Sequence, residues 1–202
     1  MRKITSLFLL LFFAGFGVFA QNSPGPSEMN KLFSKNLKYS TEARQNDQTG
    51  IVTLSVAIDD AGYPVGDPKV YSGETLLAEE VLRTYEKVKE SWDPSYLDGK
   101  KTGEDYLMTF EFILQKGTEF ISNPMTKYKK EEVVDPLKAL NKAIEENPYS
   151  SKLYKKRSEY YAMIGENWLS KLDANQSEFL KKNEITNVVI VGYGSSGKPT
   201  SL

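Results

Sequence analysis

The sequence predicts an α+β fold: a three-stranded antiparallel sheet with packed helices, followed by an all-α helical extension. Residues 50–58 and 106–114 carry apolar side chains at alternating positions, as half-buried strands do. Residues 74–90 instead place them along one stripe of a helix. The resulting order of helix, strand, strand, helix and strand is typical of helices packed on an antiparallel sheet.

The N-terminus has the layout of a secretory signal peptide. Arg2 and Lys3 precede an apolar run, and Val18-Phe19-Ala20 offers small residues for cleavage before Gln21. We therefore expect residues 1–20 to be removed and residues 21–29 to form a flexible lead-in. The alternative is an uncleaved membrane anchor, because the apolar span 4–20 has 17 residues, near the minimum that crosses a bilayer.

Composition argues against catalysis. The chain contains no cysteine and no histidine, which removes the thiol nucleophile, the commonest general base and the commonest metal ligand. Adjacent carboxylates such as Asp59-Asp60 and Glu79-Glu80 point to different faces of an element and do not converge. We predict no enzyme, no catalytic residue, no metal and no cofactor. The nearly balanced charge, −1 over the whole chain, predicts neither nucleic acid nor an anionic membrane as partner.

The first elements follow from local patterns. Apolar residues recur at helical spacing over 28–44, and Ser40 can cap a second short turn there. The strand 50–58 leads into the turn residues 59–62, which predict a hairpin. The returning strand, 65–71, is interrupted by Pro64 and Pro68, so we expect it to be irregular and at an edge.

The next elements complete the predicted sheet. The amphipathic helix 74–90 ends before Trp92 and Pro94, and a loop containing Gly99 and Gly103 leads to the last strand. One face of that strand carries large apolar side chains: Tyr106, Met108, Phe110, Phe112 and Leu114.

The ordered set of these features resembles the C-terminal domain of the TonB family over residues 30–116. It consists of Tyr39-x-x-x-Ala43-Arg44, the alternating strand from Gly50 to Asp59 with Gly62, the helix, Trp92-x-Pro94 with Gly99, and the closing strand. Ser40 stands where the family usually has proline. The resemblance implies a periplasmic, non-enzymatic module that captures the extended box segment of an outer-membrane TonB-dependent receptor beside its last strand. With residues 4–20 retained as an anchor, it implies instead an inner-membrane TonB-type energy transducer. The implied binding residues here are Tyr106, Met108, Phe110 and Phe112, through their backbone edge.

A predicted linker, 117–134, leads to a helical segment over 135–183. Asp135-Pro136 begins its first helix, Ser151 its second and Glu166 its third. The segment is similar to a tetratricopeptide repeat at Tyr154, Tyr161, Gly165, Ser170, Ala174 and Ser177. It spans about one and a half repeats, which favours a helical cap over a peptide-binding groove.

The tail, 184–202, contains "NVVIVGYGSSGKP", whose glycines have nucleotide-loop spacing. No helix can follow Pro199, so a nucleotide-binding enzyme is the less favoured interpretation. The stretch is similar to the box of starch-utilisation-type receptors, with Asn187 in place of glutamate. We predict a strand that binds in trans or pairs with its own sheet, at the edge beside residues 106–114, also allowing self-association. Its site residues are Val188, Val189, Ile190, Val191, Gly192, Tyr193 and Gly194.

Overall fold

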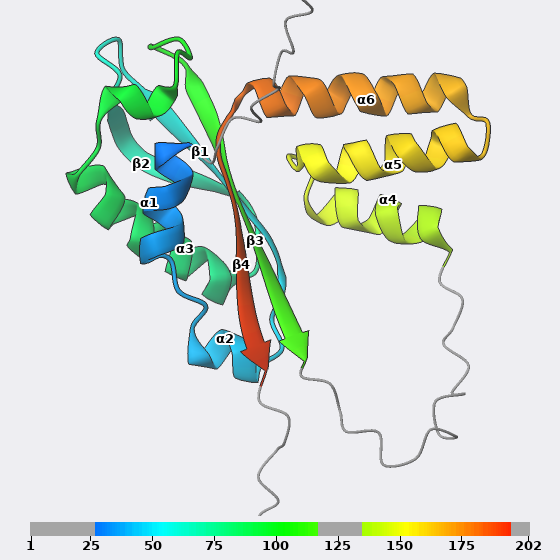
Figure 1. The fold of residues 1–202 in the computed structure, drawn as a ribbon, viewed down its shortest axis with the longest axis horizontal. Coiled ribbons are helices and arrows are strands. Elements are labelled where there is room, and N and C mark those ends of the chain that lie inside the picture. The colour runs from blue at the N-terminus through cyan, green and yellow to red at the C-terminus, as the bar shows by residue number, and fades with distance from the viewer. Residues whose placement is uncertain (1–26, 117–134, 195–202) are drawn as a thin grey trace, which may run out of the picture.

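The computed structural model describes residues 27–116 and 135–194, which form a four-stranded sheet with helices on both sides (Figure 1). The signal-peptide prediction, the linker 117–134 and the end of the tail lie outside these ranges. In the described residues, the helices are α1 Glu28–Asn36, α2 Thr41–Gln45, α3 Thr75–Glu90, α4 Pro136–Glu146, α5 Ser151–Met163 and α6 Asn167–Lys182, with a 3-10 turn at Pro94–Leu97. The strands are β1 Gly50–Ile58, β2 Pro64–Ser72, β3 Asp105–Lys116 and β4 Glu184–Gly194.

The strand order β2-β1-β3-β4 corrects the prediction of a three-stranded antiparallel sheet. β1 pairs with β2 and β3 in antiparallel fashion, but β4 lies parallel to β3. A parallel neighbour requires a crossover connection, and the helices α4–α6 lie within it. The helical segment is therefore not an extension after the sheet: it precedes the fourth strand, which completes the sheet.

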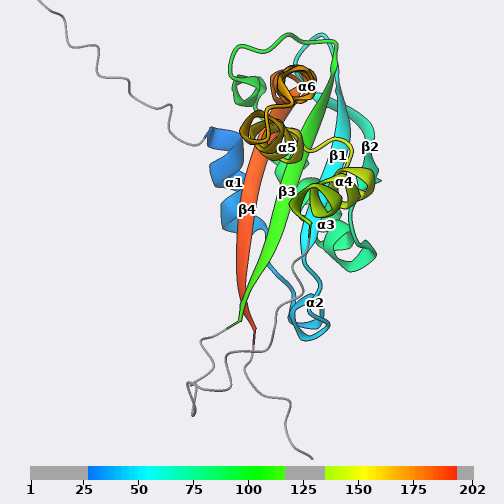
Figure 2. The ribbon, with the colours of Figure 1, turned by 90° about the vertical axis from the view of Figure 1, so that its right-hand side faces the viewer.

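The two faces of the sheet differ in their cover. On one face, α1 and α3 enclose the main core, whose fully buried large side chains include Phe33, Tyr85, Phe110 and Phe112. On the other face, Ile144 and Leu153 of the helical segment pack on Ile51 of β1. Figure 2, turned by 90°, shows α4–α6 lying across this second face.

Local sequence explains the boundaries of several elements. The Ser27 and Ser40 hydroxyls each accept a hydrogen bond from a backbone N–H in the first turn of α1 and α2, both at 3.2 Å. As predicted, β2 is an edge strand, and its pairing with β1 shows two register shifts. The indole of Trp92 donates to the carbonyl of Gly62 at 2.8 Å, which ties the end of α3 to the β1–β2 turn.

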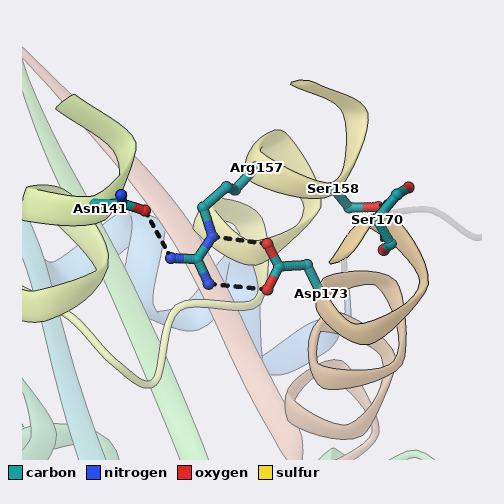
Figure 3. Close-up of polar contacts among 5 residues, drawn as sticks. All are labelled: Asn141, Arg157, Ser158, Ser170 and Asp173. Carbon is teal, nitrogen blue, oxygen red and sulfur yellow. Dashed lines mark hydrogen bonds and ion pairs between the residues drawn. The ribbon is translucent and has the colours of Figure 1, made fainter. Parts of the chain in front are cut away.

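An ion-pair network joins the three helices of the crossover. Arg157 of α5 donates through Nε and Nη2 to the carboxylate of Asp173 in α6, at 2.7 and 2.9 Å, and through Nη1 to Asn141 in α4 (Figure 3). The hydroxyl of Ser158 donates to the carbonyl of Ser170, which joins α5 to α6 a second time. The paired carboxylate raises the pKa of Arg157 above its usual value, so the guanidinium remains charged.

Candidate functional site: the sheet edge around β4

β4 covers the edge of β3 that the resemblance marks for capture of an extended segment. The parallel register aligns Phe110 with Val188 and Phe112 with Ile190. The predicted β3 side chains lie in the core, with at most 3% of Tyr106, Met108, Phe110 or Phe112 exposed. Their role is therefore packing, and only the backbone edge of β3 pairs with the tail strand.

Gly192 lies directly under the ring of Tyr39. A Cβ atom at Gly192 would stand 2.4 Å from Tyr39 Cδ1 and 3.0 Å from Arg44 Cδ, so any side chain there would overlap both residues. The Tyr39 ring also packs edge-on against Phe112 with centroids 5.3 Å apart, and its hydroxyl donates to the carbonyl of Gln48. Burial, and secondarily the nearby Asp47, raises the pKa of Tyr39, so this hydroxyl remains a donor.

Two side chains hold the outer edge of β4. Asn30 Oδ1 accepts a hydrogen bond from the backbone N–H of Asn187 at 3.0 Å, and Arg44 Nη1 donates to the carbonyl of Tyr193 at 3.4 Å. Backbone groups of alternate residues in a strand point to the same edge. The N–H and C=O groups of Val189 and Val191, which lie between these two, therefore also point outward, whereas those of Val188 and Ile190 point to β3.

The backbone groups of Val189 and Val191 on this edge have no hydrogen-bond partner among the described residues. They lie at a groove of about 500 Å³, which residues 188–193 line on one side. The residues that line the other side come from α1, α2 and the segment between them: Ser34, Leu37, Lys38, Tyr39 and Arg44. Lys38 and Arg44 make this lining positively charged.

This groove offers unpaired backbone groups of β4 and the cationic side chains of Lys38 and Arg44. Within residues 27–116 and 135–194, no group of three or more His, Cys, Asp or Glu side chains could hold a metal ion. The carboxylate pairs weighed in the sequence serve local structure: Asp59 Oδ1 accepts two backbone hydrogen bonds in its turn, and Glu80 pairs with Arg83 at 3.2 Å. Gly192 and Gly194 belong to a strand and not to a loop that opens a helix.

Sequence reasoning identified the box-like strand but missed its contacts. Tyr39 and Arg44 were noted only as part of a family pattern, although they contact Gly192 and the Tyr193 backbone. The sequence signal for these contacts was a tyrosine five positions before an arginine, together with a distant Gly-Tyr pair in the tail. Nothing in the sequence singles out Asn30 or Lys38, whose roles depend on the approach of α1 to β4.

The search for a membrane-spanning helix in the described residues found none long and apolar enough. The apolar stretch 4–20, for which an anchor was weighed, lies outside those residues.

Comparison with known proteins gives one match. Residues 35–114 match the family described as Gram-negative bacterial TonB protein C-terminal. No match was found among curated proteins or among solved structures. Domains of this family are non-enzymatic, act in envelope-associated transport and interact with outer-membrane receptors. The match includes Tyr39 and Arg44, which hold β4, and ends within β3. Residues 35–114, 80 of the 202 residues of the chain, are therefore similar to the C-terminal domain of TonB proteins.

Proposed function

We propose that the protein is a non-enzymatic periplasmic interaction module that binds an extended receptor-type segment by strand addition, in TonB-dependent transport. The observation that carries the proposal is the open edge of β4 at Val189 and Val191, which faces the groove beside Tyr39 and Arg44. An extended segment in this groove would become the fifth strand of the sheet.

The edge of β4 is a better site for an incoming segment than the edge of β3. β4 pairs with β3 from Leu107 to Lys116 and buries Ile185 and Val188 in the main core. An outside segment would have to replace all these contacts. It would also compete with a strand of the same chain, whose effective concentration is on the order of millimolar or higher. Addition beside β4 breaks no existing pairing.

The open edge supports weak, reversible binding. Val189 and Val191 each offer one N–H and one C=O, so about four backbone hydrogen bonds can form. At roughly 0.5–1.5 kcal/mol each, they contribute about 2–6 kcal/mol before the cost of ordering the segment. Lys38 and Arg44 favour a segment that carries a carboxylate, because both cations line the groove.

A peptide titration of the mature chain tests this proposal. The probe is a synthetic octapeptide with the sequence of residues 187–194, together with a version that has glutamate in the first position. Binding should protect the amides of Val189 and Val191 from hydrogen exchange, and the glutamate version should bind more tightly. Val189→Pro removes an outward donor and should weaken binding, whereas the matched Val189→Ile should not.

Two outcomes would contradict strand addition at β4. The first is the absence of binding at millimolar peptide. The second is binding that leaves Val189 unprotected and accelerates exchange at Val188 and Ile190, which would indicate replacement of β4 by the peptide.

A further inference from the structure

The outer face of α6 carries large apolar side chains that the described part of the chain leaves open. Trp168 is 71% exposed, Phe179 61% and Leu172 47%. The opposite face of α6, with Asp173, Ser177 and Leu180 buried, packs within the helical segment. Figure 1 places α6 at the outer end of the helical layer, beyond α5 and α4.

These side chains form a stripe whose spacing is the same in both directions along the helix. Trp168, Leu172, Asn175 and Phe179 are spaced by four, three and four residues, which aligns them along one side of a helix. An aromatic residue stands at each end. A second α6 running antiparallel would therefore place its Phe179 opposite Trp168 and its Asn175 opposite Leu172.

The flanking charges are complementary under the same arrangement. Lys171 and Glu178 are seven residues apart, two helical turns, and so lie on the same flank of the stripe. Neither forms an ion pair among the described residues. A two-fold axis between antiparallel helices brings equal flanks together, so Lys171 of each copy meets Glu178 of the other.

We propose that a second copy of this chain docks on the α6 stripe, defined as Trp168, Leu172, Asn175 and Phe179, to form a symmetric antiparallel dimer. The apolar stripe supplies the contact, and the two Lys171–Glu178 pairs set direction and register. One helix pair buries less surface than a standard interface of about 1,600 Å², so we expect dissociation constants above about 1 µM.

Sedimentation equilibrium of the full mature chain over a wide concentration range tests the proposal. Tryptophan emission offers a local readout: the chain has two tryptophans, and Trp92 is already buried. A blue shift on dimerisation therefore reports on Trp168. Trp168→Ala should weaken the dimer at least tenfold, because large aromatic side chains that become buried in an interface carry much of its affinity.

A charge-reversal cycle distinguishes direct Lys171–Glu178 pairing from an effect of the changed net charge. Lys171→Glu and Glu178→Lys each set like charges against each other twice, and each should weaken the dimer by about tenfold at low salt. The double reversal restores both pairs and should return the parental affinity. Lys138→Glu, on the exposed surface of α4, makes the same change in net charge as Lys171→Glu and should have little effect.

Three results would overturn the proposal. The first is a chain that remains monomeric at several hundred micromolar with unchanged tryptophan emission. The second is a double reversal that is as weak as the single ones. The third is a dimer that survives Trp168→Ala, because its interface would then lie elsewhere.

Discussion

Replacing Gly192 by alanine should loosen the fourth strand. The new methyl group would lie 2.4 Å from Tyr39 Cδ1 and 2.8 Å from Cε1, well inside van der Waals contact. The Tyr39 ring cannot turn away freely, because it packs on Phe112 and its hydroxyl is bonded to Gln48. Either the ring or β4 must therefore shift.

Overpacking of this kind costs about 1–3 kcal/mol. Alanine also leaves the unfolded chain fewer conformations than glycine does, and alanine can adopt the backbone conformation of Gly192. This effect offsets about 0.4–1 kcal/mol of the overpacking cost. The net loss, about 1.3 kcal/mol at the middle of these two ranges and at most about 2.6 kcal/mol, should appear in urea denaturation. At the middle value it should lower the Tm by about 3–5 °C. Faster amide exchange at Val188 and Ile190 should accompany it.

A double-mutant cycle with Tyr39→Ala checks the cause. Removing the ring makes room for the methyl group, so Gly192→Ala should cost almost nothing in that background. If Gly192→Ala is neutral in the parent, or equally costly in both backgrounds, β4 does not pack on Tyr39 in solution.

Three further changes test other contacts. Asp173→Ala leaves Asn141 as the one hydrogen-bond partner of the Arg157 guanidinium among the described residues and should cost about 3 kcal/mol in urea denaturation. Glu159→Ala, at an exposed pair, should cost less than about 1 kcal/mol. Burial raises the pKa of Glu184, so the folded state binds a proton at this carboxyl more tightly than the unfolded state does. The free energy of unfolding should therefore fall as pH rises from about 4.5 through the raised pKa. Glu184→Gln should make the free energy of unfolding less dependent on pH in this range. Ile190→Pro removes a hydrogen-bond donor that faces β3 and should lower the free energy of unfolding by about 1–3 kcal/mol. Val189→Pro should lower it less, because the Val189 N–H faces outward. Equal losses would contradict the assignment of Val189 to the outer edge of β4.

Most local structure could be predicted because it depends on neighbouring residues. The alternation in 50–58, the prolines at 64 and 68 and the cap at Asp135 act over a few positions, and the corresponding elements lie where they were expected. The fourth strand was recognised as strand-forming for the same reason. Its pairing beside residues 106–114 was expected as well, but its parallel direction could not be derived, since this depends on the length and path of the intervening crossover.

The same limit applies to the candidate site. Tyr39 and Gly192 are 153 positions apart, and although each belongs to a pattern noted above, nothing in the sequence links the two patterns. Their contact exists because α2 lies against the end of β4 and because glycine admits an aromatic ring at that point. A pattern of residue types records which side chains are available, but it does not record which of them are brought together by a non-local strand pairing.

The geometry of β4 also explains how the sheet can keep an open strand edge without pairing indiscriminately with other strands. A long unpaired edge would recruit other strands without selection. Here Asn30 bonds one end of the edge and Arg44 the other, which leaves only Val189 and Val191 unpaired between them. Gly192 fixes the register of this window, because the Tyr39 ring fits only over a residue without a side chain. The opening is thus short, bounded and placed beside Lys38 and Arg44, so an incoming segment must match it in length and charge.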